Sequence, residues 1–248
     1  MTHKKRSLEV TFRVALGLII VIIGGAIITK ACAPSNDCLH HASARLNILL
    51  DRSARYNEFK RKNLDRTIGD LVRGAQSNSQ INVFYMTDDG ERPKTVISLC
   101  RPNNVNVWVG DPDEVRFQIR KYVTEAIRKV TDLPHARHPQ APLVETLDTL
   151  SRDRLLAEEN GQNQVYIFSP MMQNSVNGTL SSCTTLTPPR LPNLEPYVSA
   201  VSQFYRDVPV HIFELVGGNS ETPNRSVRRC VRMFWEATLP NIASWQPL

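Results

Sequence analysis

Residues 45–55 read RLNILLDRSAR, an apolar run that ends abruptly in polar residues. The run Arg45–Leu50 predicts a buried strand, and Asp51 marks its end. Residues 55–73 then repeat apolar side chains at helical spacing, with Gly74 as the expected stop. A buried strand that passes through a polar turn into an amphipathic helix is the opening unit of an α/β sheet.

The rest of the chain continues this alternation of strands and helices. Further strands are predicted at 81–86, 95–99, 164–168 and 208–216, and further helices at 111–130, 142–159, 195–206 and 226–239. The strand at 95–99 follows its predecessor too closely for a crossover, so we expect it to be antiparallel and at an edge. The predicted fold is a doubly wound, mostly parallel α/β sheet with this one antiparallel edge strand and with helices on both faces. Residues 170–194 form a long predicted loop.

The composition excludes two classes of protein. Of the 248 residues, 41% are hydrophobic and 22% are charged, which excludes a disordered chain. The mean hydropathy of −0.29 excludes a protein with many membrane spans. The isoelectric point of about 9.2 is typical of nucleic-acid binding proteins, so the position of the basic residues has to be considered.

The basic excess is concentrated at the N-terminus. Residues 1–33 contain five basic side chains and one acidic side chain, whereas the other 215 residues contain 25 basic and 23 acidic ones. The basic residues flank the apolar run Val14–Thr29, which is interrupted only at Lys30 before Ala33. About 20 apolar residues suffice to cross a bilayer. The basic excess is therefore better evidence for how the chain is oriented in a membrane than for a polyanionic partner. Nucleic acid is not favoured as a ligand.

We expect a single-pass membrane protein with its N-terminus in the cytoplasm. Residues 1–13 are the basic cytoplasmic segment, 14–33 the transmembrane signal-anchor, 34–44 a tether, and 45–248 an extracytoplasmic, periplasmic domain. Three alternatives stay open for the apolar segment. It is a signal peptide cleaved near Ala31-Cys32-Ala33, a lipoprotein signal with Cys32 as the modified residue, or a buried core helix.

Asp51 and Ser53 are the first candidate site residues. They stand two positions apart at the carboxyl end of a predicted strand, where open α/β sheets bind their ligands. Hard cations such as Mg²⁺ prefer oxygen ligands of this kind.

At this point the sequence resembles a family. The segment ILLDRSAR looks like the opening of a von Willebrand factor A-type domain, whose metal-ion-dependent adhesion site begins Asp-x-Ser-x-Ser. The similarity continues through Ala141–Thr146 and Ile167–Pro170 and covers roughly residues 45–240. It implies a protein-binding module without catalytic residues or a bound cofactor, which recognises partners at the strand ends.

The resemblance also implies which residues would hold a divalent cation such as Mg²⁺. Asp51 and Ser53 match the first two ligand positions, and Thr146 is the candidate for the loop threonine, with Thr149 as the alternative. Arg55 stands where the family has a second serine, and Ser169-Pro170 where it has an aspartate. The metal site is therefore expected to be degenerate.

Three interpretations of this degenerate site remain open. In the first, the guanidinium of Arg55 replaces the cation and pairs with Asp51. In the second, Asp51 only caps the following helix and Arg55 lies on the solvated face of that helix. In the third, Asp51, Ser53 and Thr146 still bind a metal.

The cysteines favour disulfides. Apart from Cys32 at the membrane boundary, four cysteines remain, and an even number outside the cytoplasm suggests two bridges, with separate buried thiols as the alternative. The fold analogy implies the pairs Cys38–Cys100 and Cys183–Cys230. No CxxC pair is present, so a zinc knuckle is not supported.

The expected function is protein binding or scaffolding, in a bacterial envelope or conjugation-related assembly. The candidate binding face consists of Asp51, Ser53, Arg55, Thr146, Ser169, Gln173 and Asn174. One alternative is an envelope hydrolase that uses Asp51 with His135, His138 or His211. The other is a DNA-associated conjugation protein, although the Arg228-Arg229 pair is interpreted as a solvated helix face.

Overall fold

The computed structural model describes most of the chain after residue 41. The described residues are 42–53, 56–76, 78–87, 93–101, 112–132, 140–153, 162–181, 183, 189–215 and 225–248. The basic segment 1–13, the predicted anchor 14–33 and most of the tether lie outside them. Among the helices that are described, none combines the length and the apolar character that a membrane span requires.

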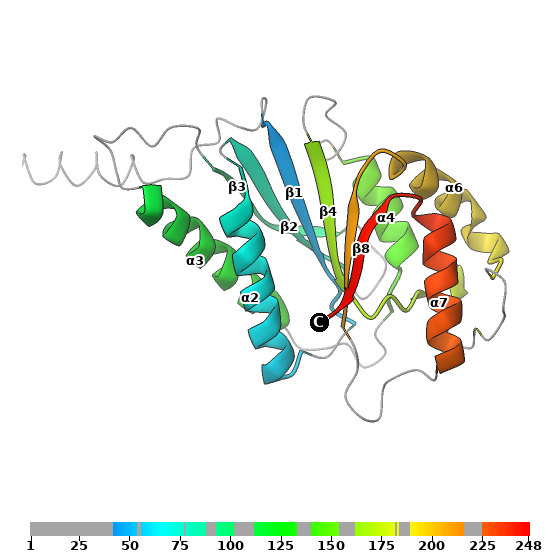
Figure 1. Cartoon of the computed structure of the whole chain (residues 1–248). Coiled ribbons are helices and arrows are strands. Elements are labelled where there is room, and N and C mark those ends of the chain that lie inside the picture. The colour runs from blue at the N-terminus through cyan, green and yellow to red at the C-terminus, as the bar shows by residue number, and fades with distance from the viewer. Residues whose placement is uncertain are drawn as a thin grey trace, which may run out of the picture.

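A six-stranded sheet forms the centre of the molecule (Figure 1), with the strand order β3-β2-β1-β4-β7-β8. The strands are β1 (Ala44–Leu50), β2 (Ser79–Tyr85), β3 (Lys94–Cys100), β4 (Gln162–Ser169), β7 (Val210–Glu214) and β8 (Ile242–Pro247). All neighbouring pairs are parallel except β2 and β3. The expected mostly parallel sheet with an antiparallel edge strand is thus confirmed.

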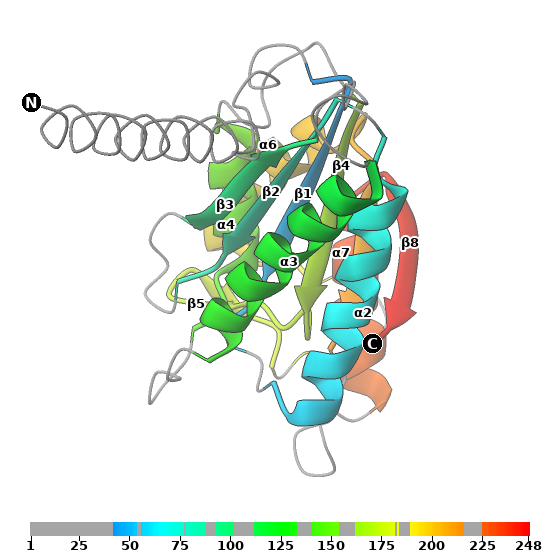
Figure 2. The same cartoon turned by 90° about the vertical axis from the view of Figure 1, so that its left-hand side faces the viewer.

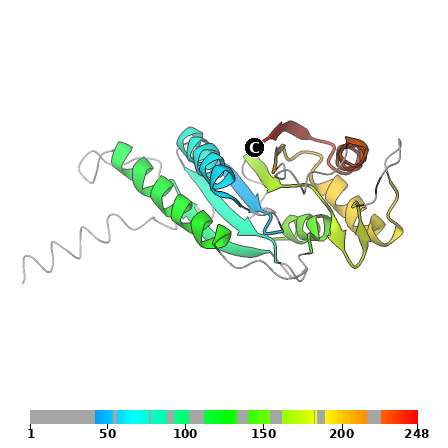
Figure 3. The same ribbon diagram turned by 90° about the horizontal axis from the view of Figure 1, so that it is seen from below.

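Helices cover both faces of the sheet, as predicted. Helices α2 (Glu58–Gly74) and α3 (Pro112–Thr131) lie on one face and stand in front of the sheet in Figure 2. Helices α4 (Leu143–Ser151), α6 (Glu195–Phe204) and α7 (Arg225–Thr238) lie on the other face, and Figure 3 shows the two layers from below. Each layer encloses its own cluster of buried apolar side chains.

The run that opens the sheet is buried on both faces because β1 lies in the middle. Leu46, Ile48 and Leu50 pack toward α2 and α3, while Leu49 packs toward the α4 layer. Its polar Asn47 is also buried and accepts a hydrogen bond from Asn82 Nδ2 of β2 at 2.8 Å. Buried polar groups of this kind are tolerated because neighbouring strands supply their partners.

Two parts of the prediction need correction. The chain does not close with the helix expected at 226–239, because β8 follows it and forms an edge of the sheet. This strand is only half-buried and has no continuous apolar run, so its sequence carries a weak strand signal. The long loop expected at 170–194 also contains regular structure, namely the hairpin of β5 (Asn174–Ser175) and β6 (Gly178–Thr179) and a short 3₁₀ turn at Pro192–Leu194.

Candidate functional site

The carboxyl ends of the central strands meet at one edge of the sheet. The amide of Asp51, just after β1, donates to Phe168 O of β4 at 2.9 Å. The amide of Leu215, just after β7, donates to Ser169 O at 3.0 Å. The residues that follow these strands therefore lie side by side, at the edge viewed in Figure 3.

Asp51 is fully buried at this edge, and both of its carboxylate oxygens accept hydrogen bonds. Oδ1 accepts from the amide of Ser53 at 2.8 Å, and Oδ2 accepts from Ser169 Oγ at 2.6 Å. Ser169 Oγ in turn accepts from the amide of Met171 at 2.8 Å. One carboxylate thus fastens the turn after β1 and the first residues after β4. The structure brings together three of the predicted site residues in this way.

Asp51 does not cap the following helix, so the capping part of the second interpretation is wrong. The cap of α2 is Asn57, whose Oδ1 accepts from the amide of Lys60 at 2.9 Å. Tyr56, immediately before the cap, donates its hydroxyl to Asp51 O at 2.8 Å. Burial, and secondly the charge of Asp51, raise the pKa of Tyr56 well above its ordinary value, so this hydroxyl stays a donor. Arg55 lies outside the described residues.

Gln173 belongs to a second polar group, at the start of α4. Its Oε1 accepts from the amide of Val144 at 2.9 Å, and its Nε2 donates to Glu145 Oε2 at 2.9 Å. Glu145 Oε1 also accepts from Ser175 Oγ at 2.5 Å and from Asn177 Nδ2 at 3.1 Å. The hydrogen bonds hold the β5–β6 hairpin against the N-terminal turn of α4, where backbone N–H groups need acceptors.

The other two candidates play different parts. Asn174 contributes its main chain, which exchanges two hydrogen bonds with Ala141, at 2.8 and 2.9 Å, while its side chain is exposed. Thr146 is buried in the first turn of α4, and among the described residues no side-chain hydrogen bond joins it to Asp51. Thr149, the alternative, donates its hydroxyl to Glu145 O at 2.9 Å within its own helix.

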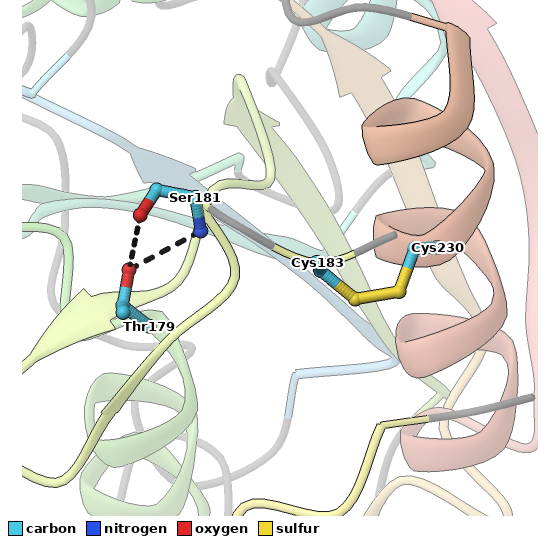
Figure 4. Close-up of a disulfide and its surroundings, with 4 residues drawn as sticks. All are labelled: Thr179, Ser181, Cys183 and Cys230. Atoms are coloured by element: carbon cyan, nitrogen blue, oxygen red, sulfur yellow. Dashed lines mark hydrogen bonds between the residues drawn. A yellow bond between two sulfur atoms is a disulfide. The ribbon is translucent and has the colours of Figure 1, made fainter. Parts of the chain in front are cut away.

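A disulfide fixes the far end of the loop that follows β4. Cys183 is bonded to Cys230 of α7, with their Cα atoms 5.8 Å apart, as predicted (Figure 4). Between these ends, the indole N–H of Trp235, also on α7, donates to Met171 O at 2.7 Å. Cys100 is disulfide-bonded as well, and Cys38, its expected partner, lies outside the described residues.

His211 does not converge with Asp51. It pairs with Tyr166, which pairs with Ile48, so it lies three residues before Asp51 along the strands and two strands away. Strand geometry places the two Cα atoms about 14 Å apart. His211 Nδ1 instead lies 2.9 Å from Ser244 Oγ, and its ring stacks on Tyr166. Burial lowers the pKa of His211. His135 and His138 lie outside the described residues.

The described residues contain no group of three or more His, Cys, Asp or Glu side chains that could hold a metal ion. Asp51 is one carboxylate at the strand ends, and its oxygens already accept the hydrogen bonds from Ser53 and Ser169.

Sequence reasoning missed two contributors to the edge. Glu145 receives hydrogen bonds from three side chains, and its only signal in the sequence was an acidic residue in a predicted first helical turn. Trp235 donates to the main chain of Met171, and this bond joins residues 64 positions apart. No local pattern records such a pairing.

No protein-family model and no curated protein matches the sequence. Among solved structures, the open form of the pilus adhesin SpaC from Lactobacillus rhamnosus GG has a TM-score of 0.50 at 8% identity, over 84% of this chain and 28% of the adhesin. A von Willebrand factor type A structure from Catenulispora acidiphila has a TM-score of 0.48 at 10% identity, over 84% of this chain and 39% of that one. BatB from Bacteroides thetaiotaomicron has a TM-score of 0.44 at 10% identity, over 82% of this chain and 89% of BatB.

The likeness to the adhesin concerns the fold alone. The mostly parallel sheet with its antiparallel edge strand agrees with the fold class expected from the sequence. The described residues form a mostly parallel six-stranded α/β sheet, an architecture consistent with a von Willebrand factor A-like or Rossmann-like fold.

Proposed function

We propose that this chain is a protein-binding module, without catalytic activity, that contacts its partner at the carboxyl edge of the sheet. The observation that carries the proposal is the fastening of the segment 170–181, named here the edge loop. It is held by Asp51 at its start, by Glu145 and the amide of Val144 in its middle, and by the adjoining Cys183–Cys230 disulfide at its end.

Such fastening favours binding because an ordered loop loses little conformational entropy when a partner docks. The side chain of Val176, at the turn of the β5–β6 hairpin, is 84% exposed although the residues around it are tied down. A rigid turn that presents an apolar side chain to solvent is a suitable anchor for a protein surface.

A second, partly exposed element is the turn after β1. The guanidinium of Arg52 lies over the ring of Tyr85, 5.5 Å from its centroid. Arginine and tyrosine are enriched among residues that dominate binding energies. We therefore assign Arg52, Ser53, Asn174, Val176 and Asn177 to the contact face, with Asp51, Ser169 and Gln173 as the buried residues that position it.

We further propose that this face works without a metal. The carboxylate of Asp51 already accepts hydrogen bonds that join the turn after β1 to the segment after β4. A hard cation needs several oxygen ligands, including at least one carboxylate, that are available to coordinate it. Calorimetric titration with Mg²⁺, Mn²⁺ and Ca²⁺ should give no heat of binding. Micromolar binding that disappears in Asp51→Ala would contradict this part of the proposal.

The location proposed for the module is outside the cytoplasm, anchored by residues 14–33 with the N-terminus inside, in an envelope or conjugation-related assembly. The Cys183–Cys230 bond supports an oxidising compartment. The apolar run at 14–33 and the basic residues before it support the anchor. Fusions of alkaline phosphatase after residue 248 should be active only if the domain is exported.

Site-specific crosslinking in cells tests the contact face. A photoreactive amino acid at Val176 should give a discrete covalent adduct with one partner, identifiable by mass spectrometry. The matched control is the same amino acid at Arg66, an exposed position on α2 and on the opposite side of the sheet. Equal adducts from both positions, or none from Val176, would refute the assignment of this face.

A further inference from the structure

Helix α7 carries a stripe of arginines on its exposed side. The stripe begins at Arg225 and continues three, four and seven residues later with Arg228, Arg229 and Arg232. Residues at these spacings lie on one side of a helix. The opposite side is the buried one, and its members are Val227, Cys230, Val231, Phe234, Trp235 and Thr238. We name the four arginines the α7 stripe.

Two members of the stripe, Arg225 and Arg228, lie in the first turn of α7, where helix electrostatics disfavours basic side chains. The N-terminal turns of a helix carry a partial positive charge, which stabilises acidic side chains and destabilises basic ones. The first turn of α7 contains no acidic residue, and the last turn contains no basic residue. This arrangement works against local helix stability, which is a typical mark of residues that serve another purpose.

Two of the arginines are held in place by neighbouring groups. Arg228 Nη2 lies 3.0 Å from Glu214 Oε1, and Glu214 Oε2 accepts from the indole N–H of Trp245 at 3.0 Å. The guanidinium of Arg232 lies over that indole, 5.3 Å from its centroid, and its Nε lies 2.8 Å from Glu236 Oε1. The two guanidinium groups are thus oriented next to a partly exposed tryptophan.

The other two arginines have no ion-pair partner among the residues that the structure describes. Arg225 and Arg229 are exposed, and no carboxylate of the described residues lies within ion-pair distance of either. A free guanidinium offers a planar pair of donors that fits one carboxylate. Within the part of the chain that the structure describes, the stripe therefore combines two oriented cations, two cations without a carboxylate partner and an aromatic ring.

We propose that the α7 stripe is a second docking surface, which binds an acidic segment of a partner protein. The partner segment would carry carboxylates three or four residues apart, which pair with the arginines. It would also carry an apolar side chain that packs against Trp245. The α7 stripe shares no residue with the contact face proposed above, because it lies on α7 beside β7 and β8, where Arg228 contacts Glu214 and Arg232 contacts Trp245.

The length and charge of the stripe favour a protein segment over a nucleic acid. From Arg225 to Arg232 the helix rises only about 10 Å, two helical turns, which matches a short acidic helix. Residues 34–248 are nearly balanced in charge, with 25 basic and 23 acidic side chains. Nucleic-acid binding usually needs a broader basic surface. Tryptophan and arginine together are typical of protein interfaces.

A designed peptide provides the probe. It is a labelled helix of about 20 residues with glutamates at spacings of three and four, and its control has glutamine at those positions. Titrated with the full chain at about 50 mM NaCl, the acidic peptide should bind, and the Arg225→Glu, Arg229→Glu variant should weaken binding at least about tenfold. The matched control, Lys62→Glu, Arg66→Glu, reverses two exposed charges on α2 and should change binding less than about twofold.

Three results would overturn the proposal. The first is equal binding of the acidic and the glutamine peptides, and the second is equal weakening by the α7 and α2 variants. The third is tighter binding of duplex DNA, or of vesicles of phosphatidylcholine and phosphatidylglycerol, that depends on Arg225 and Arg229. This last result would assign the stripe to a phosphate-bearing partner instead.

Discussion

The hydrogen bond between Ser169 and Asp51 should be a large contributor to the stability of the carboxyl edge. Ser169 Oγ donates to Asp51 Oδ2 at 2.6 Å, and both side chains are fully buried. The substitution Ser169→Ala removes this donor from a buried carboxylate. It also removes the acceptor of the Met171 amide, which Ser169 Oγ serves at 2.8 Å.

The expected loss follows from these two bonds. A hydrogen bond to a charged group contributes about 1.5–3 kcal/mol, and a neutral one about 1 kcal/mol. Ser169→Ala should therefore lower the free energy of unfolding by about 3 kcal/mol. In the double-mutant cycle with Asp51→Asn, the coupling energy should be about 1.5 kcal/mol, because the charge-assisted part is present only when both residues are.

Urea unfolding followed by circular dichroism measures these energies. The control is Ser181→Ala, which removes an exposed hydroxyl of the same loop and should cost less than about 0.5 kcal/mol. The slope of the free energy against urea should stay the same in all variants. A loss below about 0.5 kcal/mol in Ser169→Ala, or no coupling to Asp51→Asn, would refute the view that this carboxylate fastens the edge loop.

Two further perturbations test other parts of the structure. Replacing the Cys183–Cys230 bridge by Cys183→Ala, Cys230→Ala opens a loop with a sequence separation of 47 residues and should cost about 4 kcal/mol in urea unfolding. An unchanged unfolding midpoint would show that the bridge stabilises nothing. Because burial lowers the pKa of His211 below its ordinary 6.5, the unfolded chain binds more protons than the folded one. Stability should therefore fall as the pH drops from about 6.5 toward the folded-state pKa, and His211→Gln should lessen this fall in melting temperatures measured across that range. An identical pH profile in the variant would contradict the assignment.

The sequence alone was sufficient for the fold class and for most elements. The apolar run Arg45–Leu50 and its neighbours identify central strands, because strands buried on two faces read as continuous apolar runs. The short connection before β3 (Lys94–Cys100) required an antiparallel edge strand. Cysteine pairing was assigned by analogy, and Cys183–Cys230 is confirmed.

The sequence was less informative wherever a position depends on distant residues. Strand β8 is half-buried at an edge, and such strands have weak periodic signals. The sequence placed Asp51 directly after a strand, and in the structure it follows β1 at the carboxyl end of the sheet. The hydrogen bonds within the candidate site were not predicted. One interpretation had Asp51 as the cap of the following helix, whereas the cap of that helix is Asn57.

What the sequence by itself determined is the order of strands and helices, because burial periodicity and turn residues are local properties of the chain. Only the tertiary structure decided what the site residues do. Asp51 and Ser169 are 118 positions apart and become partners because parallel strands β1 and β4 end together. Trp245 comes to lie under Arg232 because β8 returns beside β7 below α7. Contacts between distant segments depend on how the layers pack, and no short stretch of sequence encodes that packing.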